Sequence, residues 1–290
     1  MPTDAWIDFD EDLSIARDLA AMSEASLPEL VRSVYARRPG WDEGRIAMRT
    51  RQVLSAPNRL ERDLDEWFAR PRQHDDRPFL DLGCGAGMLI AAAHKCGRRG
   101  VGIDVSMTWL VVAKRLIADH GGEPVLAAAV GEALPLRDAS VSAIVSLDVI
   151  EHVRDMPRYL REINRAIASQ GIVVLTTPNR FSLSAEPHVG VWGVGWLPRA
   201  WQAEFVRRQS GKSYDDTRLV SSFALRKLIR ANTDLSFRLA TPAVPSEEIA
   251  RFGRVKANLA RFYNWLVKSP AMRPAFLLVG PFFRVEAMKR

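Results

Sequence analysis

The chain has 290 residues, of which 47% are hydrophobic and 26% charged, and its formal net charge is +7. This length fits one α/β domain with additions, and the apolar content is ample for a core. Acidic residues near the start exclude the basic opening of a secretory signal, and the apolar run at 275–283 is too short to cross a bilayer. We therefore expect a cytoplasmic protein without a transmembrane segment, whose two cysteines stay reduced.

The first 75 residues predict a helical N-terminal extension. Ser26 is a suitable N-cap, and Pro28 follows in the first turn of the next helix. Apolar residues at helical spacing then predict two further helices, over 45–54 and 58–68. We place the main domain after this extension, at residues 76–290.

The main domain begins with an apolar strand, a glycine-rich turn, a helix and a second strand. Gly83, Gly85 and Gly87 follow Asp81, and Asp104 ends the second strand. Glycines at these positions let the backbone turn tightly and approach a ligand, towards which the helix N-terminus points its free N–H groups. An acid at the end of the second strand can accept hydrogen bonds from ribose hydroxyls. The segment therefore predicts a nucleoside-binding βαβ unit.

Strands and helices continue to alternate, which predicts a doubly wound, mostly parallel α/β sheet with ligands at the carboxyl ends of its strands. Between residues 161 and 179 we expect an amphipathic helix with Ile163 and Ile167 on one face, a break at Gly171, and the fifth strand. An insertion at 180–230 separates the fifth strand from the sixth. The predicted strands are 79–82, 100–103, 124–128, 141–147, 172–177, 235–240 and 282–288.

The glycine turn reads DLGCGAG, and its last glycine stands one residue earlier than in most dinucleotide-binding proteins. It is followed in order by E-A-L-P at 132–135, E-H-V at 151–153 and T-P-N at 177–179. This succession resembles the motifs of class I S-adenosylmethionine (SAM)-dependent methyltransferases, in their broad small-molecule branch. The resemblance is close over residues 78–182 and loose in the last strands. It implies a Rossmann-like methyltransferase fold of seven strands, the last one antiparallel, with SAM as cofactor.

The resemblance also implies which residues bind SAM. Asp104 takes the ribose hydroxyls, and Val105 and Met107 flank the adenine, with core packing as the alternative for these two. Where the family commonly has an aspartate this chain has Val130, so contact with the adenine edge is left to the backbone after it. The predicted cofactor-binding residues are Asp81, Gly83, Cys84, Gly85, Gly87, Asp104, Val105, Met107, Gly131, Glu132 and Asp148.

Asp148, Glu151 and His152 follow the fourth strand at spacings that one helical turn would bring to a single face. We expect His152 to act as general base, because imidazole titrates near neutral pH, with capping of the next helix as the alternative for the Glu-His pair. Together with His188, these residues also resemble part of the metal site of small-RNA 2′-O-methyltransferases. Because the pair is widespread in metal-free relatives, we predict no metal. The predicted catalytic residues are His152, Asp148, Glu151 and His188.

Two later segments carry unusual aromatic patterns. Trp192, Trp196 and Trp201, interspersed with glycines, predict an aromatic lid over the acceptor, with core packing as the alternative. Residues 251–267 predict an amphipathic helix, which either packs on its own domain or rests on an anionic membrane or a lipid-linked substrate.

We therefore expect SAM-dependent methyl transfer to a small-molecule acceptor, at a hydroxyl of a natural product, a glycan or a lipid-linked intermediate. Residues 180–290 hold 19 Lys and Arg against 8 Asp and Glu (+11), whereas residues 1–179 hold 22 against 26 (−4). This basic half keeps an RNA methyltransferase as an alternative, although no RNA-binding module is recognisable. The third alternative is a non-catalytic SAM-binding protein, against which the intact glycine turn counts. The sequence does not predict an oligomeric state.

Overall fold

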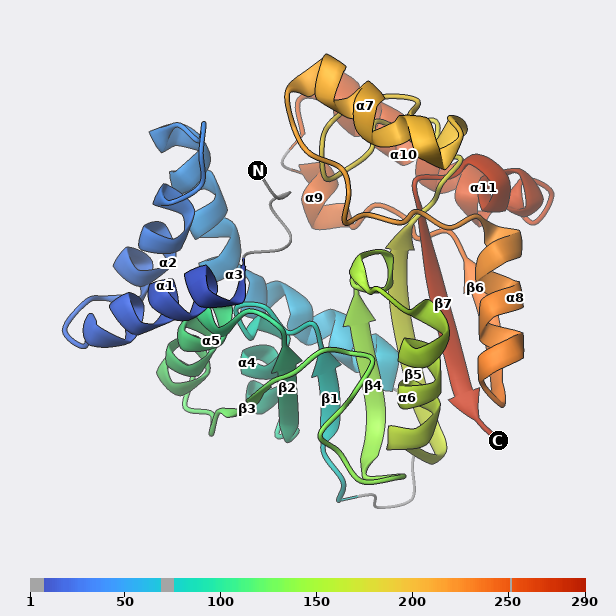
Figure 1. Ribbon diagram of the computed structural model, residues 1–290. Coiled ribbons are helices and arrows are strands. Elements are labelled where there is room, and N and C mark those ends of the chain that lie inside the picture. Colours follow the sequence, from blue (N-terminus) through green and yellow to red (C-terminus); the bar gives the residue numbers. More distant parts are fainter. Residues whose placement is uncertain (1–7, 69–75, 251) are drawn as a thin grey trace.

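The computed structural model describes residues 8–68, 76–250 and 252–290. Within this part of the chain, seven strands form one sheet in the order β3-β2-β1-β4-β5-β7-β6 (Figure 1). Strands β1 to β5 run parallel, and β7 is antiparallel to both of its neighbours, β5 and β6. This confirms the predicted sheet. The strands are β1 Phe79–Leu82, β2 Gly100–Asp104, β3 Val125–Ala128, β4 Val141–Leu147, β5 Ile167–Pro178, β6 Leu235–Ala240 and β7 Phe282–Lys289.

Strand β1 lies at the point where the winding of the sheet reverses. It pairs with β2 on one side and with β4 on the other. The chain therefore adds β2 and β3 on one side of β1 and then crosses back to add β4 on the other side. The connections that follow β1 and β4 therefore diverge at the carboxyl ends of these strands. In open α/β sheets, ligands bind at such a switch point.

Helices cover both faces of the sheet (Figure 1). Helices α4 (Met88–Lys95) and α5 (Met107–Asp119) share one hydrophobic core with the N-terminal helices, whereas α6 (Met156–Ala166) and α8 (Ser222–Asn232) share the other. Successive side chains of β1 alternate between the two cores, because Phe79 belongs to the first and Leu80 to the second. The sheet is thus buried on both faces, as a parallel sheet requires.

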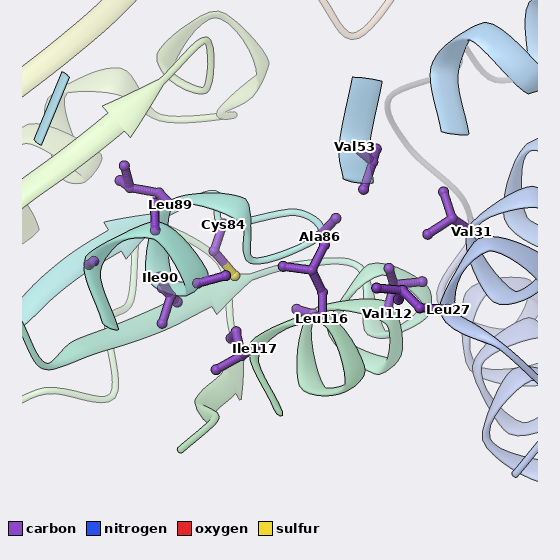
Figure 2. Close-up of a cluster of buried hydrophobic side chains, with 14 of the residues drawn as sticks. Leu27, Val31, Val53, Cys84, Ala86, Leu89, Ile90, Val112, Leu116 and Ile117 are labelled. Carbon is purple, nitrogen blue, oxygen red and sulfur yellow. The ribbon is translucent and has the colours of Figure 1, made fainter. Parts of the chain in front are cut away.

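The N-terminal extension consists of α1 (Phe9–Ala21), α2 (Leu27–Ala36) and α3 (Glu43–Phe68). The predicted cap is present, because the N–H and the hydroxyl of Ser26 both donate to the carboxylate of Glu29, at 2.8 and 2.6 Å. Figure 2 shows Leu27 and Val31 of α2 and Val53 of α3 facing the side chains of the α4 and α5 region. These helices therefore pack against the face of the sheet domain that α4 and α5 cover.

The prediction of two separate helices at 45–54 and 58–68 was wrong. Helix α3 is continuous and contains Pro57. Proline removes one N–H donor and usually kinks or ends a helix. Buried Val53 and Leu64, on either side of Pro57, belong to the same hydrophobic core, so packing against α4 holds both halves in one helix. The predicted polar link to β1 falls partly on residues 69–75, outside the described residues.

Strand β5 begins earlier than predicted, which changes the place of Ile167 and Gly171. Helix α6 ends at Ala166, and Ile167 already pairs with Val141 of β4. Gln170 takes a positive φ of 61°, and the register between β4 and β5 shifts near this point. Gly171 is required within the strand, because a Cβ there would lie 2.6 Å from the side chain of Ile167. The pairing of Ile167 with β4 thus outweighs the helical spacing of Ile163 and Ile167 in the sequence.

Two additions extend the domain beyond the sheet and its flanking helices. The first, between β5 and β6, contains η2 (Val194–Trp196) and α7 (Arg199–Ser210) and lies where the insertion was predicted. The second, between β6 and β7, contains α9 (Ser246–Ala250), α10 (Arg254–Lys268) and α11 (Arg273–Val279). The sequence predicted only α10 of these, and residue 251 of that prediction lies outside the described residues. In the described ranges, every helix is too short or too polar to span a membrane.

Candidate active site

A pocket opens at the carboxyl ends of β1, β2 and β4, where the strand order reverses. Six of the predicted cofactor-binding residues line it: Gly83, Asp104, Val105, Gly131, Glu132 and Asp148. Its wall also includes His152, Val130 and Val149. The pocket therefore joins the glycine turn to the segment that follows β4. The other predicted residues, Asp81, Cys84, Gly85, Gly87 and Met107, are not part of its lining.

The glycine turn takes left-handed backbone conformations that side chains rarely adopt. The φ angles of Gly83, Gly85 and Gly87 are 80°, 49° and 73°. At Gly83 a side chain is also excluded by close approach, because a Cβ would lie 2.3 Å from a methyl group of Val149. The turn after β1 and the segment after β4 thus touch, and Gly83 and Val149 both line the pocket.

Asp104 connects the glycine turn to the end of β2. Its Oδ2 accepts the N–H of Gly85 at 2.7 Å, and its Oδ1 accepts the N–H of Ser106 at 2.9 Å. Burial raises the pKa of the Asp104 carboxyl, and these two hydrogen bonds oppose the rise. Asp81 lies behind it, where burial and then the charge of Asp104 raise the pKa of the Asp81 carboxyl to about 8. A cationic ligand group would stabilise this pair of acids.

Asp12 of α1 is a site-supporting residue that the sequence analysis missed. Its side chain is buried, and its carboxylate accepts hydrogen bonds from the Ser106 hydroxyl at 2.9 Å and the Met107 N–H at 2.6 Å. The Thr108 hydroxyl donates to the Asp12 carbonyl at 3.1 Å. Asp12 therefore anchors the loop between Asp104 and α5. No sequence signal marks it, because all its partners are more than ninety residues away.

The remaining cofactor candidates differ in what they present to the pocket. Val105 and Val130 are each 42% exposed and line it, so they offer an apolar surface to a flat ligand group. Met107 opens α5 and is half-buried. The Cys84 side chain is buried in the core beside Gly102, where an added Cβ would lie 2.8 Å from its sulfur (Figure 2).

Asp148 follows β4 directly and takes a φ of 56°, which is uncommon for a residue with a side chain. Its Oδ1 accepts a hydrogen bond from the Thr176 hydroxyl at 2.8 Å, and the residue lines the pocket. The residue is exposed at the pocket; desolvation by the groups around the carboxyl raises its pKa, while the hydrogen bond from Thr176 opposes the rise. Backbone strain of this kind often accompanies a functional residue.

The next residues form the short helix η1 (Ile150–His152), which brings Glu151 and His152 towards His188 of the first addition. Glu151 is fully buried, and its Oε2 accepts the Thr177 hydroxyl at 2.9 Å. Its Oε1 has no hydrogen-bond partner in the described structure and lies 3.8 Å from Nε2 of His188. Burial, followed by the charge of Asp148, raises the pKa of the Glu151 carboxyl to about 8.

The two histidines face each other, with their Nε2 atoms 3.0 Å apart. Burial, followed by the positive charge of His188, lowers the pKa of His152 to about 4. Its Nδ1 is buried and its Nε2 is engaged by His188, so neither nitrogen is open to a substrate in this arrangement. Burial alone would lower the pKa of His188, but its hydrogen bond with Glu186 and the nearby acids leave it raised.

Glu186 is the second supporting residue that the sequence analysis did not select. Its Oε1 lies 2.5 Å from Nδ1 of His188, and its Oε2 accepts the N–H groups of His188 and Val189, both at 2.9 Å. The sequence places Glu186 two residues before His188, but only the turn shows that its carboxylate reaches the ring. Glu151, His152 and His188 together offer three ligand atoms within 4.8 Å of one another, so they could hold a metal ion.

The first addition has its own small core, built from Val189, Val191, Val194, Val206 and Tyr214. Trp192, Trp196 and Trp201 are 63%, 49% and 64% exposed, so valines rather than tryptophans fill this core. The Nε1 of Trp192 and that of Trp196 donate to the carbonyls of Leu183 and Ser182, which gathers these two rings around one loop. Their exposure leaves them free to meet a ligand.

Residues 80–175 match a family described as the methyltransferase domain. Among curated proteins, the chain is 30% identical to the ubiquinone biosynthesis O-methyltransferase of Brucella anthropi, over 44% of this chain and 53% of that protein. It is 32% identical to a probable SAM-dependent methyltransferase of Mycobacterium tuberculosis, over 37% of this chain and 38% of the relative. The chain thus spans about half or less of the length of these relatives.

The fold is shared with solved structures at low sequence identity. A SAM-dependent methyltransferase from Mesorhizobium loti has a TM-score of 0.54 and 17% identity, with 78% of this chain and 97% of that chain covered. The phosphoethanolamine N-methyltransferase 2 of Haemonchus contortus, solved with SAM, has a TM-score of 0.52 and 15% identity over 92% of this chain and 60% of that one. Residues 80–175 thus match the methyltransferase domain, and the chain has the fold that these SAM-dependent methyltransferases share. S-adenosyl-L-methionine is the cofactor of such methyltransferases.

Proposed function

We propose that the protein transfers a methyl group from SAM to a hydroxyl of a small-molecule acceptor. The observation that carries the proposal is a single pocket with Gly83 and Asp104 on one wall and Asp148 and His152 on another. Gly83 belongs to the glycine turn after β1 and Asp104 ends β2, whereas the second pair follows the neighbouring strand β4. The cofactor and the acceptor side chains are therefore adjacent.

The residues of this pocket fit SAM. The Asp104 carboxylate is held by two backbone N–H groups and would accept the ribose hydroxyls, while Val105 and Val130 would enclose the adenine. Asp81 is buried outside the pocket lining, and a cationic methionine end bound nearby would oppose the rise of its pKa. When bound, SAM supplies a methyl group on a positively charged sulfur, which is already activated for transfer.

The acceptor hydroxyl must lose a proton, and we assign this role to Asp148. Its carboxylate lines the pocket and is oriented by the Thr176 hydroxyl at 2.8 Å. A raised pKa makes a carboxylate a stronger base. The role proposed for His152 from the sequence passes to Asp148, because neither nitrogen of His152 is open to the pocket.

Oxygen is the proposed methylated atom, and a small molecule is the proposed acceptor. The curated relative from Brucella anthropi is named as an O-methyltransferase, which supports oxygen. The exposed Trp192 and Trp196 support an acceptor with a flat or apolar face. We place the reaction in the cytoplasm, to which the two free cysteines are suited. RNA methylation and SAM binding without catalysis remain outcomes of the test below.

Calorimetry with SAM, followed by a labelled-methyl assay on an extract of the native host, tests the proposal. We expect SAM binding at micromolar affinity and label in a small molecule, with the methylated atom identified by mass spectrometry. Label that enters RNA, together with a gel shift of RNA at a stated salt concentration, would favour the RNA methyltransferase. SAM binding without labelled product in any fraction would favour the non-catalytic protein.

A further inference from the structure

We propose that Glu151, His152 and His188 form a binding site for a divalent transition-metal ion such as Zn²⁺. The Nε2 atoms of the histidines are 3.0 Å apart, and Oε1 of Glu151 lies 3.8 Å from Nε2 of His188. An ion that binds its ligands at about 2.0–2.2 Å holds neighbouring ligand atoms about 3–3.7 Å apart. These two distances are close to the spacing that one ion imposes, and all three ligand atoms lie within 4.8 Å of one another, so small side-chain movements would bring them around one ion.

The buried carboxylate of Glu151 points to a missing cation. Its Oε2 is satisfied by Thr177, but its Oε1 is fully enclosed without a partner in the described structure. A buried carboxyl oxygen without a partner is costly in free energy. A cation between Glu151 and the two imidazoles would satisfy that oxygen and both Nε2 lone pairs at once.

Glu186 prepares His188 for this role. Because its carboxylate accepts the Nδ1–H of His188, the lone pair of that ring lies on Nε2, which faces Glu151 and His152. Two backbone N–H groups hold the other oxygen of Glu186. Metal-binding histidines almost always donate their second N–H in this manner, which fixes the ring and strengthens the ligand.

The ligand types select the ion. Two imidazoles and one carboxylate suit Zn²⁺, Fe²⁺ or Co²⁺, whereas Mg²⁺ prefers a shell of oxygens. Three protein ligands leave coordination positions for other groups. The ring of His152 lines the pocket, so an ion that came between its Nε2 and that of His188 would lie at the edge of the pocket, with its remaining positions towards the acceptor. If the proposed function holds, the acceptor carries two neighbouring oxygens that chelate the ion next to Asp148. This replaces the metal-free prediction, because the sequence did not show that His188 meets Glu151.

Co²⁺ is the probe for this site, because its visible absorption reports nitrogen and oxygen ligands. The purified full-length protein is treated with a chelator, dialysed and titrated with Co²⁺ and, separately, with Zn²⁺ by calorimetry. We expect one ion per chain. Binding should be lost in His188→Ala and Glu151→Gln, and should weaken about ten- to a hundred-fold in Glu186→Gln. His94→Ala, which changes an exposed histidine far from the site in sequence, should bind like the parent.

SAM affinity, measured on every variant, shows whether it is folded. Because metal binding is measured without SAM or acceptor, failure of the metal site leaves the proposed methyl transfer untouched. Absence of stoichiometric Co²⁺ and Zn²⁺ binding in the parent would overturn the proposal. Equal binding by the parent and a folded His188→Ala variant would do so as well.

A second inference concerns α10, which we propose binds the surface of an anionic lipid membrane. Val255, Leu259, Phe262 and Trp265 are 75%, 64%, 57% and 66% exposed. At about 100° per residue, the first three lie within an arc of about 60°, and Trp265 widens this arc to about 120°. These large apolar side chains thus face outward, which favours the second of the two alternatives left open by the sequence, a surface contact, over packing on their own domain.

The opposite side of α10 attaches it to the domain through small and polar residues. Ala257 and Ala260 are buried, and the side chain of Asn264 makes two hydrogen bonds, both 2.8 Å, with the backbone of Val244. The ring of Tyr263 also packs edge-on against Phe276 of α11. The outward face is therefore fixed in the fold, because these contacts hold the helix in one rotation.

The charges of α10 select the partner. Arg254, Lys256, Arg261 and Lys268 flank the apolar face, and the helix contains no acidic residue. An exposed apolar face between basic flanks is the pattern of helices that lie in the interface of anionic membranes. A protein partner would need an acidic apolar groove, whereas a lipid surface offers negative charge and an apolar interior everywhere.

Co-sedimentation with vesicles tests this surface. We expect the full-length protein to sediment with phosphatidylcholine vesicles that contain phosphatidylglycerol, and at least ten-fold more weakly with phosphatidylcholine alone. The double variant Phe262→Ser, Trp265→Ser should lose binding, whereas Trp201→Ser, at an equally exposed tryptophan of α7, should keep it. Equal binding by the double variant and the parent would overturn the proposal. The proposal would also be overturned if the parent failed to bind vesicles and formed a dimer that the double variant converts to a monomer.

Discussion

The carboxylate of Asp12 accepts a hydrogen bond of 2.6 Å from the backbone N–H of Met107, 95 residues further along the chain. The same carboxylate accepts the hydroxyl of Ser106, so α1 satisfies donors at the start of α5. This contact lies directly after Asp104 and adds negative charge that raises the pKa of the Asp104 carboxyl. The N-terminal extension is thus tied to the proposed ribose-binding loop.

Asp12→Ala should lower the free energy of unfolding by about 1–3 kcal/mol, because it leaves buried N–H and hydroxyl donors without an acceptor. It should also weaken SAM several-fold, since the loop that carries Asp104 loses its anchor. Urea unfolding and calorimetry with SAM measure the two effects. Asp10→Ala, at an exposed acid of the same helix, is the matched control. Unchanged stability in Asp12→Ala would show that the contact contributes nothing.

Asp104→Ala should weaken SAM about ten-fold or more. The substitution removes charge-assisted hydrogen bonds to the ribose, worth about 1.5–3 kcal/mol, and frees the N–H of Gly85. Calorimetry gives the affinity, and Asp119→Ala, at the exposed end of α5, controls for loss of charge. A folded Asp104→Ala protein that binds SAM like the parent would rule out this ribose contact.

Local pattern was sufficient for the parallel strands, apart from the start of β5, and for the glycine turn, whereas the antiparallel last strand came from the family resemblance. Strand β4 is apolar except for Ser142 and Ser146, and Gly83 and Gly87 adopt the positive φ angles that favour glycine. Long-range contacts were not visible in the sequence. Nothing near Asp12 predicts Met107 as its partner, and the continuity of α3 through Pro57 depends on packing against α4.

For the candidate catalytic residues, too, local sequence predicted some features, whereas others depend on long-range contacts. The spacing of Asp148, Glu151 and His152 predicted their proximity, and η1 gathers the last two. The role of His152 could not be read from that spacing, because it depends on His188 arriving from the first addition and closing off Nε2. The backbone geometry directly after a strand follows from the local sequence. The hydrogen-bond partner of a histidine nitrogen depends instead on residues far away in the sequence.

Asp81 should make stability fall as pH rises in the absence of SAM. Burial raises its pKa in the folded protein to about 8, well above its ordinary value in the unfolded chain. Its contribution is therefore complete below pH of about 4 and is lost progressively as pH approaches 8, at about 1.4 kcal/mol per pH unit. Asp81→Asn should lack this decline in urea unfolding between pH 5 and 7. Parallel pH profiles of the two proteins would contradict the assignment.

Trp196→Ala should impair turnover of the acceptor while leaving SAM affinity within about two-fold of the parent value. The ring is 49% exposed, packs against Phe181 and is not part of the pocket that holds the proposed cofactor residues. An acceptor that stacks on it would lose about 1–3 kcal/mol of binding, seen as a raised KM. Phe223→Ala, at an exposed aromatic side chain of α8, is the control. Equal loss of SAM and acceptor binding in a folded variant would place the ring at the cofactor instead.

Asp148→Asn should lower kcat about a hundred-fold, because the acceptor hydroxyl loses its proton acceptor. Asparagine has nearly the same shape and also tolerates the left-handed conformation that Asp148 adopts at a φ of 56°. The backbone should therefore stay in place, and SAM affinity should remain within about two-fold of the parent value. Thr176→Val removes only the hydrogen bond that orients the carboxylate and should cause a smaller loss of rate. Single-turnover measurements at saturating SAM isolate the chemical step from product release. If Asp148→Asn transfers methyl groups as fast as the parent, the proton leaves by another route and Asp148 does not act as the base.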